Sequence, residues 1–297
     1  MAQKDLKSRI SSVKNIQKIT RAMEMVAAAR LRRAEQRIEH LRPYAAAIRR
    51  MTRQAAEAAE NIPRLPILQQ HEREEKIGLL AVTGDRGLAG AFNSQILRAG
   101  LRAASEHEQE GRSVRWYASG RRGVSSLTFR GLDVVGSYVG FTDRPAYANA
   151  REIAEDLMSA FVDGEIDRVD IFYNGYISPL TQEVRRETLL PLQEASILEE
   201  GDDEPDEQPV HAALVEYEPE PEEILRRLIP DYVEISVFRA LLESTASEHG
   251  ARMTAMRNAS DNAGELIENL TLQANRARQA EITQEIMEVV AGAEALG

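Results

Sequence analysis

The chain has 297 residues with few aromatic and many charged side chains (5% and 29%), a balance that favours long exposed helices with a modest core over a large compact enzyme. It contains no cysteine, which excludes disulfides, thiol catalysis and cysteine-based zinc sites. The net charge of −11 is uneven: residues 1–50 carry thirteen Lys and Arg against four Asp and Glu, whereas residues 194–223 carry thirteen acidic residues and no Lys or Arg. This pattern predicts charged partners.

Residues 4–59 predict a long amphipathic helix. Its apolar residues recur mostly at steps of three and four, and they are Leu6, Ile10, Val13, Ile16, Ile19, Met23, Val26, Leu31, Ala34, Ile38 and Leu41. Pro43 is expected to kink or lightly break this helix, because proline lacks the backbone donor. A basic helix that binds DNA, phosphate or anionic lipid stays open as an interpretation. An organelle transit peptide is a third interpretation, but the helix is too long and its seam too regular for a segment that is removed. We favour pairing with another helix of the same chain.

After Pro63 and Pro66 the pattern of apolar and polar residues changes. Strands and helices alternate, which predicts an α/β domain of Rossmann-like type with a largely parallel sheet. The expected strands are residues 76–83, 113–118, 133–138, 168–177 and 181–192, the last two paired through a turn at Ser178-Pro179. The expected helices are residues 91–110, 121–129 and 145–162.

The glycine-rich turn at residues 84–90 resembles a phosphate-binding loop only superficially. Its spacing is GxxGxxG rather than GxGxxG, it lacks the GK[ST] ending, and the second strand leads into Ser119-Gly120-Arg121 without an acid to hold a ribose. We interpret it as a structural turn. The sequence contains no GxSxG elbow, no metal-ligand spacing and no cluster of paired acids in a pocket-like context, so it predicts no catalytic residue, cofactor site or metal site.

The acidic segment of residues 194–221 predicts a solvated loop that contains a candidate edge strand at residues 210–216. It ends in Tyr217-Glu-Pro-Glu-Pro221, and a helix is expected to start at Glu222. Pro230 is placed at the junction between that helix and a much longer one.

Residues 231–295 contain no proline and only three glycines, and they predict a helix of roughly 100 Å, far too long for one compact core. Its apolar seam continues to Ile282, Ile286 and Val289, as in a helix that pairs with another helix. The expected fold is α/β, with a long antiparallel two-helix coiled coil made by the two ends of the chain and the α/β domain inserted between them. The expected division is 1–60 (shaft helix), 76–193 (α/β domain), 194–221 (acidic loop and foot) and 222–297 (shaft helix).

Several segments carry a family resemblance. Residues 12–33 at one end, residues 251–256, 260–264 and 275–285 at the other, and the turn at residues 84–90 resemble the signature segments of the γ subunit of bacterial F-type ATP synthases. The resemblance covers nearly the whole chain. It implies a rotor without catalytic residues, whose shaft stands in a ring of alternating α and β subunits while its α/β domain stands with the ε subunit on a membrane ring of c subunits.

The resemblance also implies where this rotor works and how it moves. The cysteine-bearing insertion of chloroplast γ subunits is absent and the signature begins near Met1, so we expect a bacterial protein that is peripheral to the cell membrane on its cytoplasmic side. Small or polar residues on the long helix are interpreted as a surface for sliding contact, and they are Ala246, Ser247, Gly250, Ala251, Ala255, Ala259 and Ser260.

Five residues are predicted to contact partner subunits. By the resemblance, Met23, Arg278 and Gln279 contact loops of the catalytic β subunits, and the first two are expected at similar levels of the antiparallel pair. Tyr217 and Glu218 are expected to contact the ε subunit or the c ring. The alternatives are that Arg278 is a solvated helix residue and that the segment around Tyr217 is a linker.

Two other classes of function are kept as rivals. One is a nucleotide-binding α/β regulator with coiled-coil arms, which saturable ATP binding would reveal. The other is a basic coiled-coil DNA binder, which a salt-dependent affinity for duplex DNA would reveal. The second is disfavoured because the long C-terminal helix adds acids to the pair and no separate recognition module is present.

Overall fold

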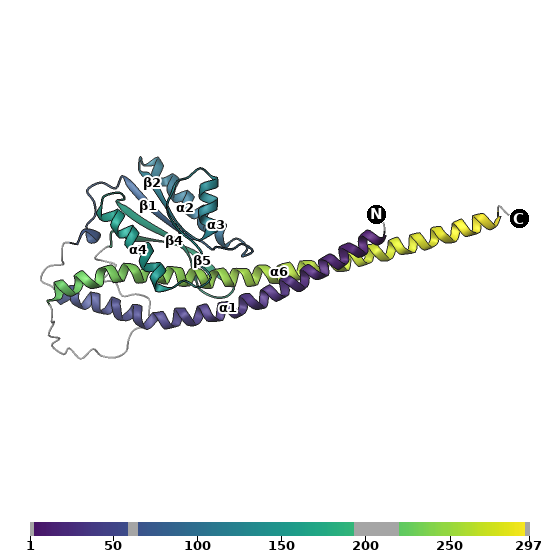
Figure 1. Cartoon of the computed structure of the whole chain (residues 1–297), viewed down its shortest axis with the longest axis horizontal. Helices are drawn as coiled ribbons and strands as arrows, with labels where there is room; N and C mark the ends of the chain where they lie inside the picture. The colour runs from purple at the N-terminus through teal and green to yellow at the C-terminus, as the bar shows by residue number, and fades with distance from the viewer. Residues whose placement is uncertain (1–2, 59–64, 193–219, 295–297) are drawn as a thin grey trace. The chain divides into compact units, whose positions relative to one another are not determined.

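The computed structural model describes residues 3–58, 65–192 and 220–294 (Figure 1). The chain divides into two compact units. One consists of Arg30–Ala251 and contains the α/β sheet, and we call it the sheet unit. The other combines Met1–Ala29 with Arg252–Gly297, and we call it the terminal unit. Both long helices contribute to both units.

The two long helices are α1 (Gln3–Ala58) and α6 (Pro221–Glu294). Pro43 lies inside α1 and does not end it. Pro230 likewise lies inside α6, so the expected junction between two helices at this position is wrong. A proline removes one hydrogen bond of the helical ladder, but the apolar neighbours of Pro230, such as Ile229 and Val233, are completely buried and hold the helix through that point.

The sheet has five strands in the order β3-β2-β1-β4-β5. The strands are β1 (Lys76–Val82), β2 (Ser113–Ser119), β3 (Val134–Tyr138), β4 (Arg168–Tyr176) and β5 (Gln182–Leu190). β1 pairs in parallel with both β2 and β4, β2 pairs in parallel with β3, and only β5 is antiparallel to its neighbour β4. The predicted α/β sheet, largely parallel with a final hairpin, is confirmed.

Helices cover both faces of the sheet, because side chains of a strand alternate between the two faces. On one face, Ile77 and Leu79 of β1 pack against α2 (Phe92–Gln109) and α3 (Arg121–Phe129). On the other, Leu80 and Val82 pack against α4 (Tyr147–Val162) and against α6, whose contributions are Leu225, Ile229, Val233, Val237, Ala240 and Leu241. The second core is therefore completed by α6, and the sheet and this part of the helix fold as one body.

The helices α1 and α6 run antiparallel and are in contact, as predicted. In the terminal unit, Leu6 of α1 packs with Leu270 and Ala274 of α6. The amide of Gln17 donates to the carbonyl oxygen of Ser260 at 3.2 Å. In the sheet unit, Ala45 and Ile48 pack with α6 through the buried side chains of Leu228 and Ile235.

The apolar seam of α6 pairs with α1 only up to Ala277. Every residue from 278 to 291 is exposed, and the exposed fraction of Val289 is 72%. The prediction that Ile282, Ile286 and Val289 extend the contact with α1 is therefore wrong. The antiparallel register explains this. Leu6, near the first residue of α1, already lies beside Leu270 and Ala274, so the residues of α6 that follow extend past the start of α1.

Candidate functional site

Three loops follow the carboxyl ends of parallel strands in the sheet unit. They are residues 83–91 after β1, 139–146 after β3 and 177–181 after β4. The chain leaves β1 toward β2 on one side, and β4 lies on the other side, so the strand order reverses between β1 and β4. In open α/β sheets the crevice at such a reversal is where ligands bind.

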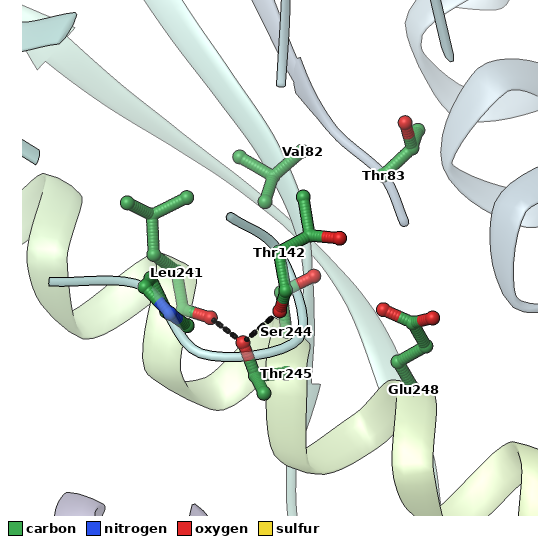
Figure 2. Close-up of a pocket in the computed structure, with 8 residues that line it drawn as sticks. Val82, Thr83, Thr142, Leu241, Ser244, Thr245 and Glu248 are labelled. Carbon is green, nitrogen blue, oxygen red and sulfur yellow. Dashed lines mark hydrogen bonds between the residues drawn. The ribbon is translucent and has the colours of Figure 1, made fainter. Parts of the chain in front are cut away.

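In this chain α6 occupies that position. The hydroxyl of Ser247 donates to the carbonyl oxygen of Asn174, near the end of β4, at 3.0 Å. The hydroxyl of Thr245 donates to the carbonyl oxygen of Thr142 at 2.9 Å (Figure 2). All four side chains are buried. The helix thus supplies its own polar groups where an α/β enzyme would hold a ligand.

Little space remains at this contact. The cavity there has a volume of about 10 Å³ and is lined by Val82, Thr83, Thr142, Pro145, Leu241, Ser244, Thr245 and Glu248 (Figure 2). A ligand pocket typically needs roughly 300–1,000 Å³. This crevice is therefore a packed contact between the loops and α6, with no room for a nucleotide.

Two glycines permit the close approach. A Cβ on Gly84 would stand 2.7 Å from the carboxylate of Glu248, which is almost fully buried. A Cβ on Gly250 would stand 2.9 Å from the backbone carbonyl oxygen of Pro179 in the β4–β5 hairpin. Glycine within a helix is unfavourable, so its presence at position 250 is explained by this backbone contact.

Asp85 holds the glycine turn against its neighbours. Its Oδ1 accepts from the backbone N–H of Arg121, at the start of α3, at 3.0 Å. Its Oδ2 accepts from the N–H of Gly140 at 2.9 Å and from the hydroxyl of Thr142 at 3.0 Å. Burial alone would raise the pKa of Asp85, but these hydrogen bonds outweigh it and lower the pKa. A carboxylate of the chain itself therefore supplies the negative charge that the amino end of α3 favours.

The same loops contact α1 through polar side chains. Asp143 forms ion pairs with Arg30 of α1, at 2.7 Å, and with Arg86 of the glycine turn, at 3.3 Å. The hydroxyl of Tyr176, at the end of β4, donates to Glu35 of α1. The guanidinium of Arg37 donates to the carbonyl oxygen of Pro145. Three loops at the strand ends therefore hold both long helices, and we call this set of contacts the junction.

The structure does not bring the predicted contact residues together. Met23 is half-buried on α1, and its neighbour Glu24 forms a 2.9 Å ion pair with Arg257. Arg278 and Gln279 are exposed on α6, and Arg278 lies 21 residues beyond Arg257. The expectation that Met23 and Arg278 share a level is therefore wrong.

Two further sequence-based expectations have different outcomes. Tyr217 and Glu218 lie outside the described residues. The expected sliding surface is corrected by the structure. Ala246, Ser247, Gly250 and Ser260 are buried, and Ala251, Ala255 and Ala259 are half-buried. Ser247 is bonded to Asn174 and Gly250 lies against Pro179, so the chain itself covers these two positions. Sequence analysis missed the junction because the run Ser244-Thr-Ala-Ser247 contains no large apolar residue. The signal for it was this run of small residues, followed three positions later by Gly250 within the helix.

Neither a metal cluster nor a membrane span is found in the described parts of the chain. Across residues 3–58, 65–192 and 220–294, no group of three or more His, Asp or Glu is arranged to hold a metal ion. Within the same ranges, no helix is both long and apolar enough to cross a membrane. The geometry is that of an α/β sheet whose strand ends hold a pair of long helices, with α6 filling the crevice at the strand ends.

Comparison with known proteins identifies the family of this chain. A sequence profile described as ATP synthase matches residues 2–296. The ATP synthase gamma chain of Rubrobacter xylanophilus is 45% identical over 293 residues, which cover 99% of this chain and 98% of the relative. That of Halothermothrix orenii is 42% identical with the same coverage. The chain belongs to the ATP synthase γ-chain family. It is a central-stalk rotor subunit, and the catalytic sites of the complex lie in the β subunits.

Solved structures agree with this assignment. A chain of the Tetrahymena thermophila mitochondrial ATP synthase, from a structure of its central stalk and c ring, matches with a TM-score of 0.60 and 26% identity, covering 82% of this chain and 99% of that one. A chain of the Euglena gracilis mitochondrial ATP synthase matches with a TM-score of 0.69 and 18% identity, covering 99% and 94%, and supports the fold.

Proposed function

We propose that this rotor turns inside a head of alternating α and β subunits and stands, with an ε subunit, on a ring of c subunits at the cytoplasmic face of a bacterial cell membrane. The relatives at 42–45% identity are bacterial gamma chains, and the Tetrahymena structure joins a central stalk to a c ring. The observation that carries the proposal is the junction, because a sheet that holds both helices at its strand ends must turn together with them.

The division of labour along the chain follows from that assignment. Residues 1–60 and 222–297 form the shaft, residues 76–193 form the base, and residues 194–221 form a foot that contacts the ε subunit or the c ring through Tyr217 and Glu218. The test is purification of the tagged chain from its native membrane with identification of the co-purifying subunits by mass. Recovery of the chain without catalytic or c subunits would contradict the proposed assembly.

Met23, Arg278 and Gln279 are proposed to contact loops of the catalytic β subunits. The exposure of Arg278 and Gln279 supports this role, because an arginine fork and an amide can bind carboxylates or amides of a partner. Replacing both by alanine is expected to lower coupled ATP synthesis in the assembled complex without unfolding the chain. Gln284→Ala is the matched control, since this exposed glutamine lies about 120° around the helix from Arg278 and about 140° from Gln279.

Met23 offers an independent test of the same contact region. Met23→Lys adds a charge to a half-buried position of the shaft, and we expect it to lower the ratio of ion transport to ATP hydrolysis by adding a contact that hinders rotation. Parental synthesis rates in both this variant and the double alanine variant would remove these residues from the β contact and leave the family assignment intact.

The rival nucleotide-binding function is disfavoured by the contacts of the glycine turn. Asp85 occupies the amino end of α3, and Glu248 lies against Gly84, where a phosphate would have to approach. We therefore propose that residues 84–90 bind no nucleotide. Saturable ATP binding to the purified chain in calorimetry, abolished by Gly87→Val, would establish the rival.

A further inference from the structure

The two long helices are attached to the α/β part in different ways. α6 is held by its apolar side chains, and Val233 and Val237 are completely buried in the core beneath the sheet. Residues 30–37 of α1 instead meet the strand-end loops through hydrogen bonds and one ion pair, described above. A motion of the sheet therefore reaches α6 through packing, whereas residues 30–37 of α1 are bonded to the strand ends and their loops by polar side chains.

Among these polar contacts, Asp143 has a special position. It is bonded to Arg30 on α1 and to Arg86 on the glycine turn, so it links the shaft helix with the end of β1. Its backbone is also fixed, because the preceding residue Thr142 is bonded to Asp85 and to Thr245 of α6. The carboxylate is thus oriented by the sheet side before it meets Arg30.

We propose that Asp143 is a positioning residue that makes α1 follow the rotation of the sheet. Its side chain is 30% exposed and that of Arg30 is 38% exposed, so water only partly screens the pair. Without the carboxylate, the positive charges of Arg30 and Arg86 would repel each other. This repulsion would push α1 away from the loop, which is a larger effect than the loss of one attractive contact. The proposal rests on the rotor function of the family.

The first test measures the attachment itself. The chain has no cysteine, so Gln36→Cys on α1 and Glu152→Cys on α4, both exposed positions of the sheet unit, accept a pair of spin labels. In the assembled complex, Asp143→Asn is expected to broaden the distribution of distances between the labels. High salt should broaden it in the parent but not further in the variant, because salt screens a pair that the variant has already lost.

Matched variants separate this role from a general structural one. Asp163→Asn makes the same change at an exposed carboxylate of the sheet unit that accepts a 3.4 Å hydrogen bond from the hydroxyl of Ser159, and it should leave the distances unchanged. Arg30→Gln removes the same pair from the α1 side and should reproduce the broadening, with no further effect in the double variant. Asp143→Glu keeps the charge and should restore part of the narrow distribution.

The functional measurement is the ratio of ATP-driven ion transport to ATP hydrolysis in membrane vesicles. We expect Asp143→Asn to lower this ratio by about two- to fivefold, the factor that a partly exposed ion pair represents, while hydrolysis itself continues. An unchanged distance distribution in Asp143→Asn would overturn the proposal and leave the rotor function intact. A labelled parent chain that does not assemble with catalytic subunits would instead contradict the proposed function.

Discussion

One helix, α6, behaves as two different structures along its length. In the sheet unit, no residue from 228 to 251 is exposed, although the run includes Glu234, Glu248 and His249. In the terminal unit, every residue from 278 to 291 is exposed, although the run includes Ile286 and Val289. Both stretches mix apolar with charged residues. Burial was therefore decided by what surrounds the helix rather than by its own polarity.

The difference between the two parts of α6 fits the function of a rotor. In the sheet unit, polar groups of α6 are bonded to the loops of the sheet, so that stretch moves with the base. In the terminal unit, the pair is held by a narrow seam that includes the contact of Leu6 with Leu270, and much of its surface is exposed. The following variants test the comparison, and the leucine and glycine changes alter the same residue type in both units.

The largest contrast is expected for leucine-to-alanine changes. Leu241→Ala, in the core beneath the sheet, should lower the free energy of unfolding of the sheet unit by about 2–5 kcal/mol, because it leaves a cavity. Leu270→Ala, at the thinner seam, should cost less and affect only the terminal unit. Urea unfolding distinguishes the two, since the single tryptophan, Trp116, is buried in the sheet and reports that unit alone. A shift of the Trp116 transition by Leu270→Ala would contradict the comparison.

A buried charge gives the next largest effect. Asp170 is completely buried and accepts from Arg168 at 2.8 Å and from Arg186 at 2.7 Å. Burial alone would raise its pKa, but these two arginines lower it below the ordinary value. Asp170→Asn should lower the free energy of unfolding by about 1–3 kcal/mol, because it leaves the guanidinium groups without their counter-charge.

The pH dependence of this group has a definite sign. Since the folded pKa of Asp170 is lowered, the unfolded state binds the proton more readily, and its stabilisation is fully present above the unfolded pKa of about 3.9. That stabilisation is lost as the pH falls through the folded value. Urea unfolding of Asp170→Asn and the parent should therefore converge in strongly acidic solution. An equal difference between them at pH 7 and in acid would show that packing, not charge, is responsible.

Glycine-to-alanine changes should have opposite signs in the two units. At Gly250 the new Cβ would meet the backbone carbonyl of Pro179 at 2.9 Å, so Gly250→Ala should destabilise by about 1–3 kcal/mol through overpacking. At Gly264 it would meet only the side-chain amide of Gln17, at 3.2 Å, which can move. Gly264→Ala should therefore stabilise by up to about 1 kcal/mol through helix propensity. Thermal unfolding followed by circular dichroism checks both, and destabilisation by Gly264→Ala would show a tighter terminal pair than described.

The smallest effect is expected at the ion pair of the terminal unit. Arg257 and Glu24 lie 2.9 Å apart with side chains 51% and 21% exposed. Glu24→Gln should change the free energy of unfolding by less than about 1 kcal/mol, and high salt should remove the difference. A larger, salt-independent loss would mean that this pair is structurally as important as the polar contacts of the junction.

Sequence alone determined the elements and their order. The apolar steps of α1 and α6 predicted two long helices, and the alternation of strands and helices between them predicted the α/β sheet with its final hairpin. These signals are local, because helix and strand periodicities are written in neighbouring residues. The signature segments at both ends carried the family, which the comparisons confirm.

The tertiary structure alone decided which residues face each other. The register of the antiparallel pair separates Met23 from Arg278, and it leaves Ile286 without a partner on α1, yet no local pattern fixes how far two helices slide along one another. Likewise, the small residues around Ser247 suit a sliding surface as well as a packed contact. Only the fold brings the ends of β1, β3 and β4 against them, because that meeting joins residues more than 70 positions apart.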